Sequence, residues 1–398
     1  MIALAALLAL APPPPATAAA APPAVQSAPP TTHAAPVVDT YHGVAVADLY
    51  RWLEDGDAPE VRTWSDAQNA HARAYLDGLP AAPELRRRIA DIVAAISQSY
   101  KGFQLRGSTL FALTFQPPKQ QQFLVAFATP NSPADLQVLV DPNVLDPTSA
   151  TTIDWFVPSP DGRRLAVSLS AGGSESGDVH LFDAATGADA GERVPRVQSG
   201  TAGGSLAWTP DGAGFYYTRY PRPGERPAED LPFYQQVGFH RLGTPTAEDR
   251  YEIGEEFPKT AEIKLLASPD SPRLLAEVQL GDGGRFAHYL HKANGRWRRL
   301  TGFDDGVVQA VWGPGDVLFL VSRRNAPRGK VLRLAAASSG LADTVTVVPE
   351  GSDTLVSDFY GTAPIAATAT RLYLTYQLGG PSEVRAFDHD GHPQAAPR

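Results

Sequence analysis

A tight Pro-Asp-Gly turn that leads straight into an apolar strand recurs along this chain. In the clearest copy, the turn at Pro160–Gly162 precedes the strand-forming run Leu165–Val167. Proline presets the backbone angle at the start of such a turn, and glycine accepts the left-handed angle at its end. A second Pro-Asp-Gly turn lies at Pro210–Gly212, variant turns lie at Pro269–Ser271 and Pro314–Asp316, and two fainter copies lack this turn sequence. The six copies are aligned on the first apolar residue after each turn, which is Leu110, Leu165, Phe215, Leu274, Leu318 or Leu372. Their spacing of about 50 residues indicates a repeated supersecondary unit.

Each repeat also contains other runs of strand length. A leading strand is predicted at Ile153–Phe156, Ser205–Trp208, Ile263–Leu266, Val307–Trp312 and Val356–Tyr360. A later strand is predicted at Val179–Asp183, His288–Lys292 and Val384–Asp388, closing on Gly187, Gly295 and Gly391, and a last strand at Trp297–Leu300 and Val345–Val348. Four short strands in each repeat of about 40–50 residues are typical of a β-propeller blade.

Burial favours a propeller over the alternative fold, a β-sandwich with unrelated hairpin turns. A small four-stranded sheet has two faces to bury, and neighbours stacked around an axis bury both of them. Independent hairpin turns would not keep one spacing through six copies. We therefore expect a fold dominated by β structure, with about six propeller blades.

The composition excludes several classes of function. The chain has 34 Lys and Arg against 43 Asp and Glu, a formal net charge of -9 that disfavours a nucleic-acid partner. It has no cysteine, which excludes a disulfide framework, a thiolate metal site and a thiol nucleophile. We expect no cofactor and no metal.

The first 36 residues indicate export. Residues 1–20 hold an apolar run too short to span a bilayer and end in small residues, as a signal peptide does, but without a basic start. If the start codon has been assigned inside a longer signal peptide, the basic start would be missing and the protein would still be exported. Residues 21–36 are rich in Pro, Ala and Thr and are expected to be a disordered spacer. We expect a periplasmic or secreted protein with no membrane association after signal cleavage.

Residues 37–97 have a helical pattern. Asp57 is expected to cap a first helix with Glu60 as its capping-box partner, and this helix carries Val61, Trp64 and Tyr75. A second helix presents an apolar stripe made of Leu85, Ile89, Ile92, Val93 and Ile96. No helical partner for this stripe is predicted elsewhere in the chain. We expect it to bury against the propeller rim or against a further domain.

The run Asp48–Asp55, followed by Trp64 and Ala67-Gln68-Asn69, resembles the N-terminal motif of the prolyl oligopeptidases. It departs from the family at Leu49, where the family usually has proline. The resemblance covers the chain from about Val38 onward and also includes Val140–Leu145, Ala207–Gly212, Phe215–Pro221 and Phe239–Pro245. It is closer to the proline-specific group than to related peptidases that cut after basic residues.

This resemblance implies a serine-type endopeptidase that cleaves short peptides after proline. Family members join an α/β-hydrolase domain to an inserted seven-bladed propeller, and the N-terminal segment belongs to the hydrolase domain. Residues 37–97 would then be that helical segment, and residues 98–398 a propeller incomplete at its C-terminus. The Ser, Asp and His triad lies in the C-terminal part of family members, so the missing hydrolase domain would be the covalent partner of this chain.

The sequence gives no candidate catalytic residue. A nucleophile elbow requires Gly-x-Ser-x-Gly, because glycines must flank a serine held on a strained turn. The nearest string, Gly173–Gly177, has Glu175 at its centre and is interpreted as a hairpin loop. Asp304 and Asp305 are interpreted as turn formers.

The histidines give no candidate metal-binding or cofactor-binding residue. His288 and His291 are three positions apart on a predicted strand, so they face opposite sides and cannot share a metal ion. The others lie in the spacer, before or on the first helix, on predicted strands or beside a turn: His33, His42, His71, His180, His240, His389 and His392.

Two functions stay open at this point, and whether the chain itself is an enzyme stays open with them. The first is the N-terminal part of an exported prolyl oligopeptidase, whose propeller gates the access of short proline-containing peptides to a catalytic domain. The second is a non-catalytic exported propeller that binds peptides or a partner protein. In the first case the last blade leaves a sheet face unpacked, so we expect the chain alone to be poorly stable and prone to associate.

Overall fold

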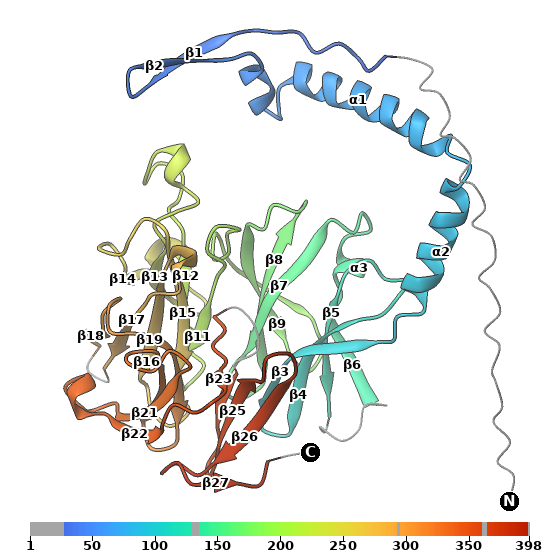
Figure 1. Cartoon of the computed structure of the whole chain (residues 1–398). Coiled ribbons are helices and arrows are strands. Elements are labelled where there is room, and N and C mark those ends of the chain that lie inside the picture. Colours follow the sequence, from blue (N-terminus) through green and yellow to red (C-terminus); the bar gives the residue numbers. More distant parts are fainter. Residues whose placement is uncertain (1–27, 129–134, 293–294, 360–363, 397–398) are drawn as a thin grey trace, which may run out of the picture. The chain divides into compact units, whose positions relative to one another are not determined.

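The structure is a computed structural model that describes residues 28–128, 135–292, 295–359 and 364–396. The expected signal peptide at residues 1–20 and the first part of the expected spacer, residues 21–27, lie outside the described residues. Met1–Ile96 and Ser97–Arg398 form two compact units (Figure 1). No helix in the described part of the chain is long and apolar enough to cross a bilayer.

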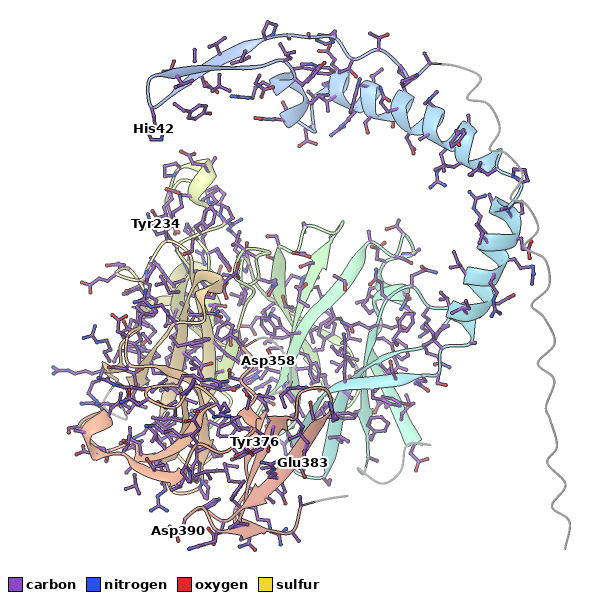
Figure 2. The ribbon with its side chains drawn as sticks, viewed as in Figure 1. His42, Tyr234, Asp358, Tyr376, Glu383 and Asp390 are labelled. Atoms are coloured by element: carbon purple, nitrogen blue, oxygen red, sulfur yellow. The ribbon has the colours of Figure 1, made fainter. Side chains whose placement is uncertain are left out.

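The N-terminal unit begins with a β-hairpin, which the helical pattern did not predict. Strands β1 (Val37–Tyr41) and β2 (Val44–Asp48) are antiparallel, and His42 lies at the tip of the hairpin (Figure 2). His42 and Gly43 have positive φ angles of 52° and 83°, as a two-residue type I′ turn requires. The short helix η1 (Arg51–Glu54) follows. Its Arg51 donates to Asp39 on β1 (2.6 Å) and to Asp48 on β2 (2.9 Å), so it ties the motif run to both strands.

Helix α1 (Pro59–Asp77) was predicted, but its capping box was predicted wrongly. The N-cap is Ala58, which makes no side-chain cap, and the Asp57 carboxylate accepts a hydrogen bond from Arg62 (2.6 Å). Pro59 explains the difference. It occupies the first helical position and disfavours a helical conformation at the residue before it, which makes Ala58 the boundary.

Helix α2 (Ala82–Ala94) confirms the second predicted helix, and its apolar stripe is exposed. Four of the predicted stripe side chains lie on α2 and retain between 45% and 60% of their accessible surface: Leu85, Ile89, Ile92 and Val93. Ile96, the predicted last member, follows the end of the helix and is also exposed. No residue of α2 is buried. The helix therefore gains little stability from burial of its own apolar face.

The second unit consists of six antiparallel sheets, one for each predicted repeat (Figure 1). Blade 1 comprises β3 (Ser99–Arg106), β4 (Thr109–Phe115), β5 (Phe123–Phe127) and β6 (Leu136–Val140). Blade 2 comprises β7 (Thr151–Pro158), β8 (Arg164–Ala171), β9 (Gly177–Asp183) and β10 (Asp189–Val194). Blade 3 comprises β11 (Leu206–Trp208), β12 (Gly214–Arg219), β13 (Gln236–Arg241) and β14 (Arg250–Ile253).

The remaining three blades follow in chain order. Blade 4 comprises β15 (Ala261–Ala267), β16 (Leu274–Leu280), β17 (Phe286–His291) and β18 (Trp297–Thr301). Blade 5 comprises β19 (Val307–Gly313), β20 (Val317–Ser322), β21 (Lys330–Ala335) and β22 (Val345–Val348). Blade 6 comprises β23 (Thr354–Leu355), β24 (Ile365–Ala367), β25 (Leu372–Gln377), β26 (Ser382–Phe387) and β27 (Pro393–Gln394). Short helices occupy connections: α3 (Pro142–Leu145), η3 (Ala228–Asp230), η4 (Thr246–Glu248), η5 (Gly281–Gly283) and η6 (Leu341–Asp343).

Consecutive blades share hydrophobic cores. Phe111 of blade 1 belongs to one buried cluster with Phe156 and Leu165 of blade 2, and the corresponding clusters join each blade to the next up to blade 6. Both faces of an inner blade are therefore buried. This arrangement confirms the β-propeller and excludes the sandwich, in which two sheets would enclose a single core.

Tryptophan side chains connect the first strands of neighbouring blades. The Trp208 indole N–H donates to the Val157 carbonyl of blade 2 (3.1 Å), and the Trp312 indole donates to the Leu266 carbonyl of blade 4 (2.8 Å). Both tryptophans stand two residues before the proline of their turn. The same position in the repeat therefore makes the same contact between blades.

The leading strand predicted at Val356–Tyr360 is wrong over residues 356–359, which are not in a strand, and Tyr360 lies outside the described residues. Blade 6 instead pairs β25 with two short pieces, β23 and β24. After β23 the chain contacts blades 5 and 4, where Gln309 donates to the Asp358 carbonyl (2.9 Å) and Lys264 donates to the Phe359 carbonyl (2.9 Å). These side-chain contacts replace part of the strand ladder.

Candidate functional site

The Gly173–Gly177 string lies in the loop between β8 and β9, which confirms its interpretation as a hairpin loop. Glu175 has a positive φ of 51°, and the Ser176 backbone N–H donates to Ser174 Oγ (3.3 Å). These are local turn contacts. The segment does not form the strand-to-helix elbow that presents a nucleophilic serine.

His288 and His291 face opposite sides of β17, as predicted. His288 contacts Glu277 (3.0 Å), whose carboxylate also accepts the Ala310 N–H of blade 5 (2.9 Å). His291 faces blade 3, with its ring 5.2 Å from that of Tyr216. Among the described residues, no three histidine or acidic side chains gather closely enough to hold a metal ion.

The other predicted histidines are dispersed. His33 stacks on Trp52 (4.3 Å between ring centroids), and His71 lies on α1. His180 stacks beside Phe182, His389 lies beside Phe319, and His392 contacts Asp388 (2.9 Å). Asp305 accepts the Gly302 N–H (2.8 Å), and Asp304 and Asp305 pair with Arg285 and Arg324, so both aspartates belong to a turn as predicted.

A long loop in blade 3, residues 220–235, carries the candidate site. It connects β12 to β13 and contains Pro221, Pro223, Pro227 and Pro232, which lack the N–H groups that a strand ladder needs. Arg196 anchors both ends of the loop by donating to the carbonyls of Pro221 (2.8 Å) and Leu231 (2.7 Å). The loop is thus held away from the sheet and forms walls for two pockets.

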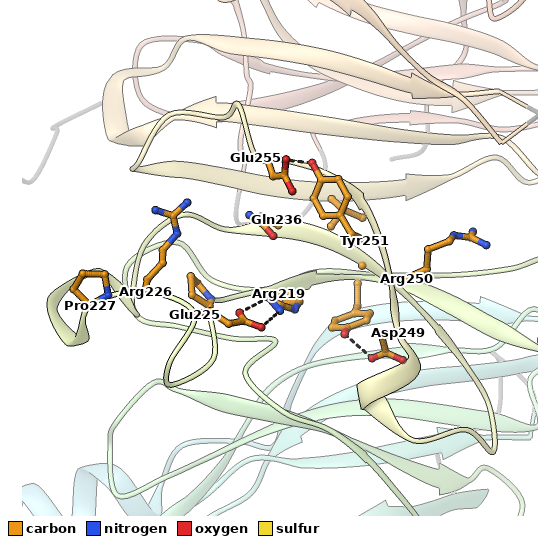
Figure 3. A pocket seen from close by; sticks show the side chains of 13 residues that line it. Arg219, Glu225, Arg226, Pro227, Gln236, Asp249, Arg250, Tyr251 and Glu255 are labelled. Atoms are coloured by element: carbon orange, nitrogen blue, oxygen red, sulfur yellow. Dashed lines mark hydrogen bonds and ion pairs between the residues drawn. The ribbon is translucent and has the colours of Figure 1, made fainter.

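The larger pocket has a volume of about 630 Å³ and lies between loop 220–235 and strands β12, β13 and β14 (Figure 3). Tyr217, Asp249 and Gly238 line it on the strand side. Gly238 makes room for the Tyr217 ring, because a Cβ at this position would lie 3.1 Å from it. We call this cavity the blade 3 pocket.

The charges around the blade 3 pocket are partly neutralised. Arg219 forms a two-pronged ion pair with Glu225, one contact of which is 2.9 Å. Burial opposes ionisation of Glu225, but hydrogen bonds from the Arg222 backbone and from Arg219 outweigh it and hold the pKa of Glu225 below its usual value. Arg250 pairs with the buried Glu252 (2.6 Å).

A second pocket of about 330 Å³ is lined by Tyr220, Pro232 and Phe233 of loop 220–235. Phe233 and Tyr220 give it aromatic walls, and Lys259 lies 4.8 Å from the Phe233 ring centroid and pairs with Asp230 (2.5 Å). Burial and a neighbouring carboxylate, Glu262, help to raise the pKa of the Tyr220 hydroxyl, which therefore stays protonated.

A buried charge cluster joins blade 3 to blade 2 behind the blade 3 pocket. His240 lies between Asp249 (2.6 Å) and Glu192 of β10 (2.8 Å), and its side chain is fully buried. The Tyr217 hydroxyl donates to the other oxygen of Asp249 (2.7 Å). Burial disfavours an imidazolium, but the two carboxylates outweigh this effect and raise the pKa of His240. We call these four residues the His240 cluster.

Sequence reasoning found His240 as a strand residue but not its partners. Glu192 and Asp249 are 57 positions apart in the chain, and only the stacking of two blades brings them together. The pocket residues were missed for a similar reason, because a proline-rich loop predicts an irregular segment but not the shape that it takes.

Both pockets lie in the β-propeller, and a helical segment precedes the propeller in the chain. The chain belongs to the prolyl oligopeptidase family: residues 29–396 match the family model described as prolyl oligopeptidase, N-terminal beta-propeller domain.

Known relatives agree with this assignment. The prolyl endopeptidase of Elizabethkingia meningoseptica is 25% identical over 359 residues, covering 89% of this chain and 48% of the relative. Prolyl oligopeptidase A of Galerina marginata is 23% identical, covering 88% of this chain and 50% of the relative. The chain therefore spans about half the length of the curated relatives that it matches.

Solved structures show the same fold. A chain from a structural study of two prolyl endopeptidases superposes with a TM-score of 0.78 and 27% identity, covering 92% of this chain and 52% of that one. Prolyl oligopeptidase B of Galerina marginata, bound to a 35mer hydrolysis and macrocyclization substrate, superposes with a TM-score of 0.73 and 19% identity, covering 92% and 53%.

Proposed function

We propose that this chain is the propeller part of an exported serine-type endopeptidase that cleaves short peptides after proline. The observation that carries the proposal is the match to the family's propeller domain over residues 29–396 together with six stacked blades. The N-terminal apolar run supports export to the periplasm or beyond.

In this proposal the propeller selects substrates by size. The two pockets beside loop 220–235 offer aromatic, proline and charged surfaces of the size that holds short peptides. The prolyl oligopeptidase B structure bound to a peptide substrate supports peptides as the substrate class. We therefore expect folded proteins to be poor substrates.

The exposed stripe on α2 supports a covalently attached hydrolase domain as the structural partner. Its four apolar side chains keep about half of their surface exposed, and a stripe of this kind needs a partner face. The alternative function, a non-catalytic propeller that binds peptides or a protein, leaves this stripe unexplained.

Hydrolysis of succinyl-Gly-Pro-4-nitroanilide tests the proposal. We expect the 398-residue chain not to hydrolyse this substrate. We expect the complete product of its reading frame to hydrolyse it, and a fluorophosphonate to abolish that hydrolysis. A complete product that folds but neither hydrolyses the substrate nor reacts with the fluorophosphonate would favour the non-catalytic propeller. Turnover by the 398-residue chain alone would contradict the absence of catalytic residues from it.

A further inference from the structure

Two unpaired opposite charges line the blade 3 pocket. Arg226 belongs to loop 220–235 and Glu255 follows β14, and both are lining residues of the cavity (Figure 3). Within the described part of the chain, neither side chain has an ion-pair or hydrogen-bond partner. The other charged groups of the pocket are engaged, since Arg219 pairs with Glu225, Arg250 with Glu252, and Asp249 belongs to the His240 cluster. The cavity therefore presents one free cation and one free anion.

The free cation is held in position. The Arg226 guanidinium lies 3.7 Å from the centroid of the Tyr234 ring in the same loop. Stacking on an aromatic face reduces the rotamer freedom of an arginine and leaves its in-plane N–H donors available. A planar carboxylate is the group that such a fork of donors matches best.

The free anion lies beside an ordered tyrosine. The Glu255 backbone N–H donates to the Tyr251 hydroxyl (3.0 Å), which fixes the start of the segment that carries the Glu255 carboxylate. The lining of the pocket also includes the apolar side chains of Pro221, Pro227 and Val237. The Gln236 amide, also in the lining, offers a donor and an acceptor to a peptide group.

We propose that the blade 3 pocket binds a short peptide with free ends, whose terminal carboxylate contacts Arg226 and whose terminal ammonium contacts Glu255. The peptide class of the ligand rests on the proposed function, whereas the requirement for two charged ends rests on the pocket alone. A volume of about 630 Å³ lies within the range of small-ligand sites, about 300–1,000 Å³. The site discriminates against the interior of a long chain, which has no charged ends.

Calorimetric titration of the 398-residue chain with the tripeptide Ala-Pro-Ala tests this site. The same peptide is titrated with an amidated C-terminus and with an acetylated N-terminus. We expect each cap to weaken binding by about tenfold, because each removes one charge-assisted contact. Arg226→Gln should weaken binding of the free peptide by a similar factor and make binding indifferent to amidation. Glu255→Gln should do the same for acetylation.

Matched controls are available on the same blade. Arg241→Gln and Glu248→Gln remove exposed charges that do not line the pocket and should leave all three titrations unchanged. Circular dichroism confirms that each variant is folded. The site is contradicted if capped and free peptides bind equally well, if Ala-Pro-Ala does not bind, or if the control variants weaken binding as much as Arg226→Gln.

This result is separable from the proposed function. A complete gene product that hydrolyses the chromogenic substrate while the chain fails to bind Ala-Pro-Ala overturns the blade 3 site alone. Binding that follows the predicted pattern supports the site even if the complete product proves inactive.

Discussion

His240 carries a buried charge that two blades share. Its ring contacts carboxylates from β10 and from the residue before β14, and the Tyr217 hydroxyl donates to the second of them. The pKa of His240 is raised above its usual value of 6.5 because these carboxylates outweigh the effect of burial. The folded state thus binds this proton more tightly than the unfolded chain does. The resulting stabilisation is complete below about pH 6.5 and is lost as the pH rises through the higher folded-state pKa.

Replacing His240 tests this cluster. We expect His240→Gln to lower the free energy of unfolding by about 3 kcal/mol at pH 6, because the buried carboxylates of Glu192 and Asp249 lose the cation between them. The loss should shrink as the pH rises. Urea unfolding between pH 6 and pH 9 measures both effects, with the exposed hairpin variant His42→Asn as the control. A penalty that does not change with pH would mean that His240 is neutral in the folded protein.

The tryptophan contacts between blades give a second prediction for single residues. Trp312→Phe keeps an aromatic ring but leaves the Leu266 carbonyl without its indole donor. We expect a loss of about 1–2 kcal/mol in the free energy of unfolding, the usual cost of one unpaired buried group. Trp64→Phe removes an indole donor from α1 and should not change the propeller transition. Equal losses in the two variants, measured by urea unfolding, would contradict a specific contact between blades.

The glycines that close the third strand of a blade have a role that only the stacked structure shows. Gly187 packs against the Leu139 carbonyl of blade 1, and Gly391 packs against the Val347 carbonyl of blade 5. A Cβ at either position would overlap the last strand of the preceding blade. Gly295 occupies the corresponding turn of blade 4, but among the described residues a Cβ there would meet no atom within 4 Å. All three have positive φ angles, of 73°, 92° and 78° respectively.

Alanine substitutions at these three glycines distinguish the cost of backbone strain from the cost of overpacking. We expect Gly295→Ala to cost about 1 kcal/mol of unfolding free energy, the cost of an L-residue at positive φ. Gly187→Ala and Gly391→Ala should cost about 2–4 kcal/mol, because overpacking against a neighbouring blade is added. Thermal unfolding of the three variants measures the difference. Equal losses of unfolding free energy in the three variants would show that the last strands of blades 1 and 5 move to accommodate the added methyl group.

Much of the element pattern followed from the sequence, because turn chemistry and alternation are local. The Pro-Asp-Gly turns preceded the second strands as predicted, and runs such as Val179–Asp183 and Val345–Val348 are strands. Two local predictions were wrong, the cap of α1 and the leading strand of blade 6. Pro59 displaced Asp57 from the cap of α1, and residues 356–359 contact Gln309 and Lys264 instead of forming the predicted strand. The pockets could not be predicted, since they depend on the path of loop 220–235 rather than on its composition.

At the scale of the whole molecule, the exposed stripe on α2 predicts association of the chain. Apolar side chains that keep about half of their surface in water favour contact with another apolar face. We expect the 398-residue chain to self-associate, and Ile89→Glu to shift it toward monomer without moving the propeller unfolding transition. Sedimentation velocity over a range of concentrations measures the change. A wild-type chain that stays monomeric and unfolds reversibly in one cooperative step would contradict this expectation.

The most direct test of a gating propeller compares the cleavage of one sequence in a free peptide and in a folded protein. The complete gene product is given a short Gly-Pro-containing peptide, and then the same sequence within an exposed loop of a folded protein. A propeller that gates a peptidase predicts efficient cleavage of the free peptide and at least a hundredfold slower cleavage, about 3 kcal/mol, of the folded substrate. Equal kcat/KM for the two substrates would contradict a gating propeller.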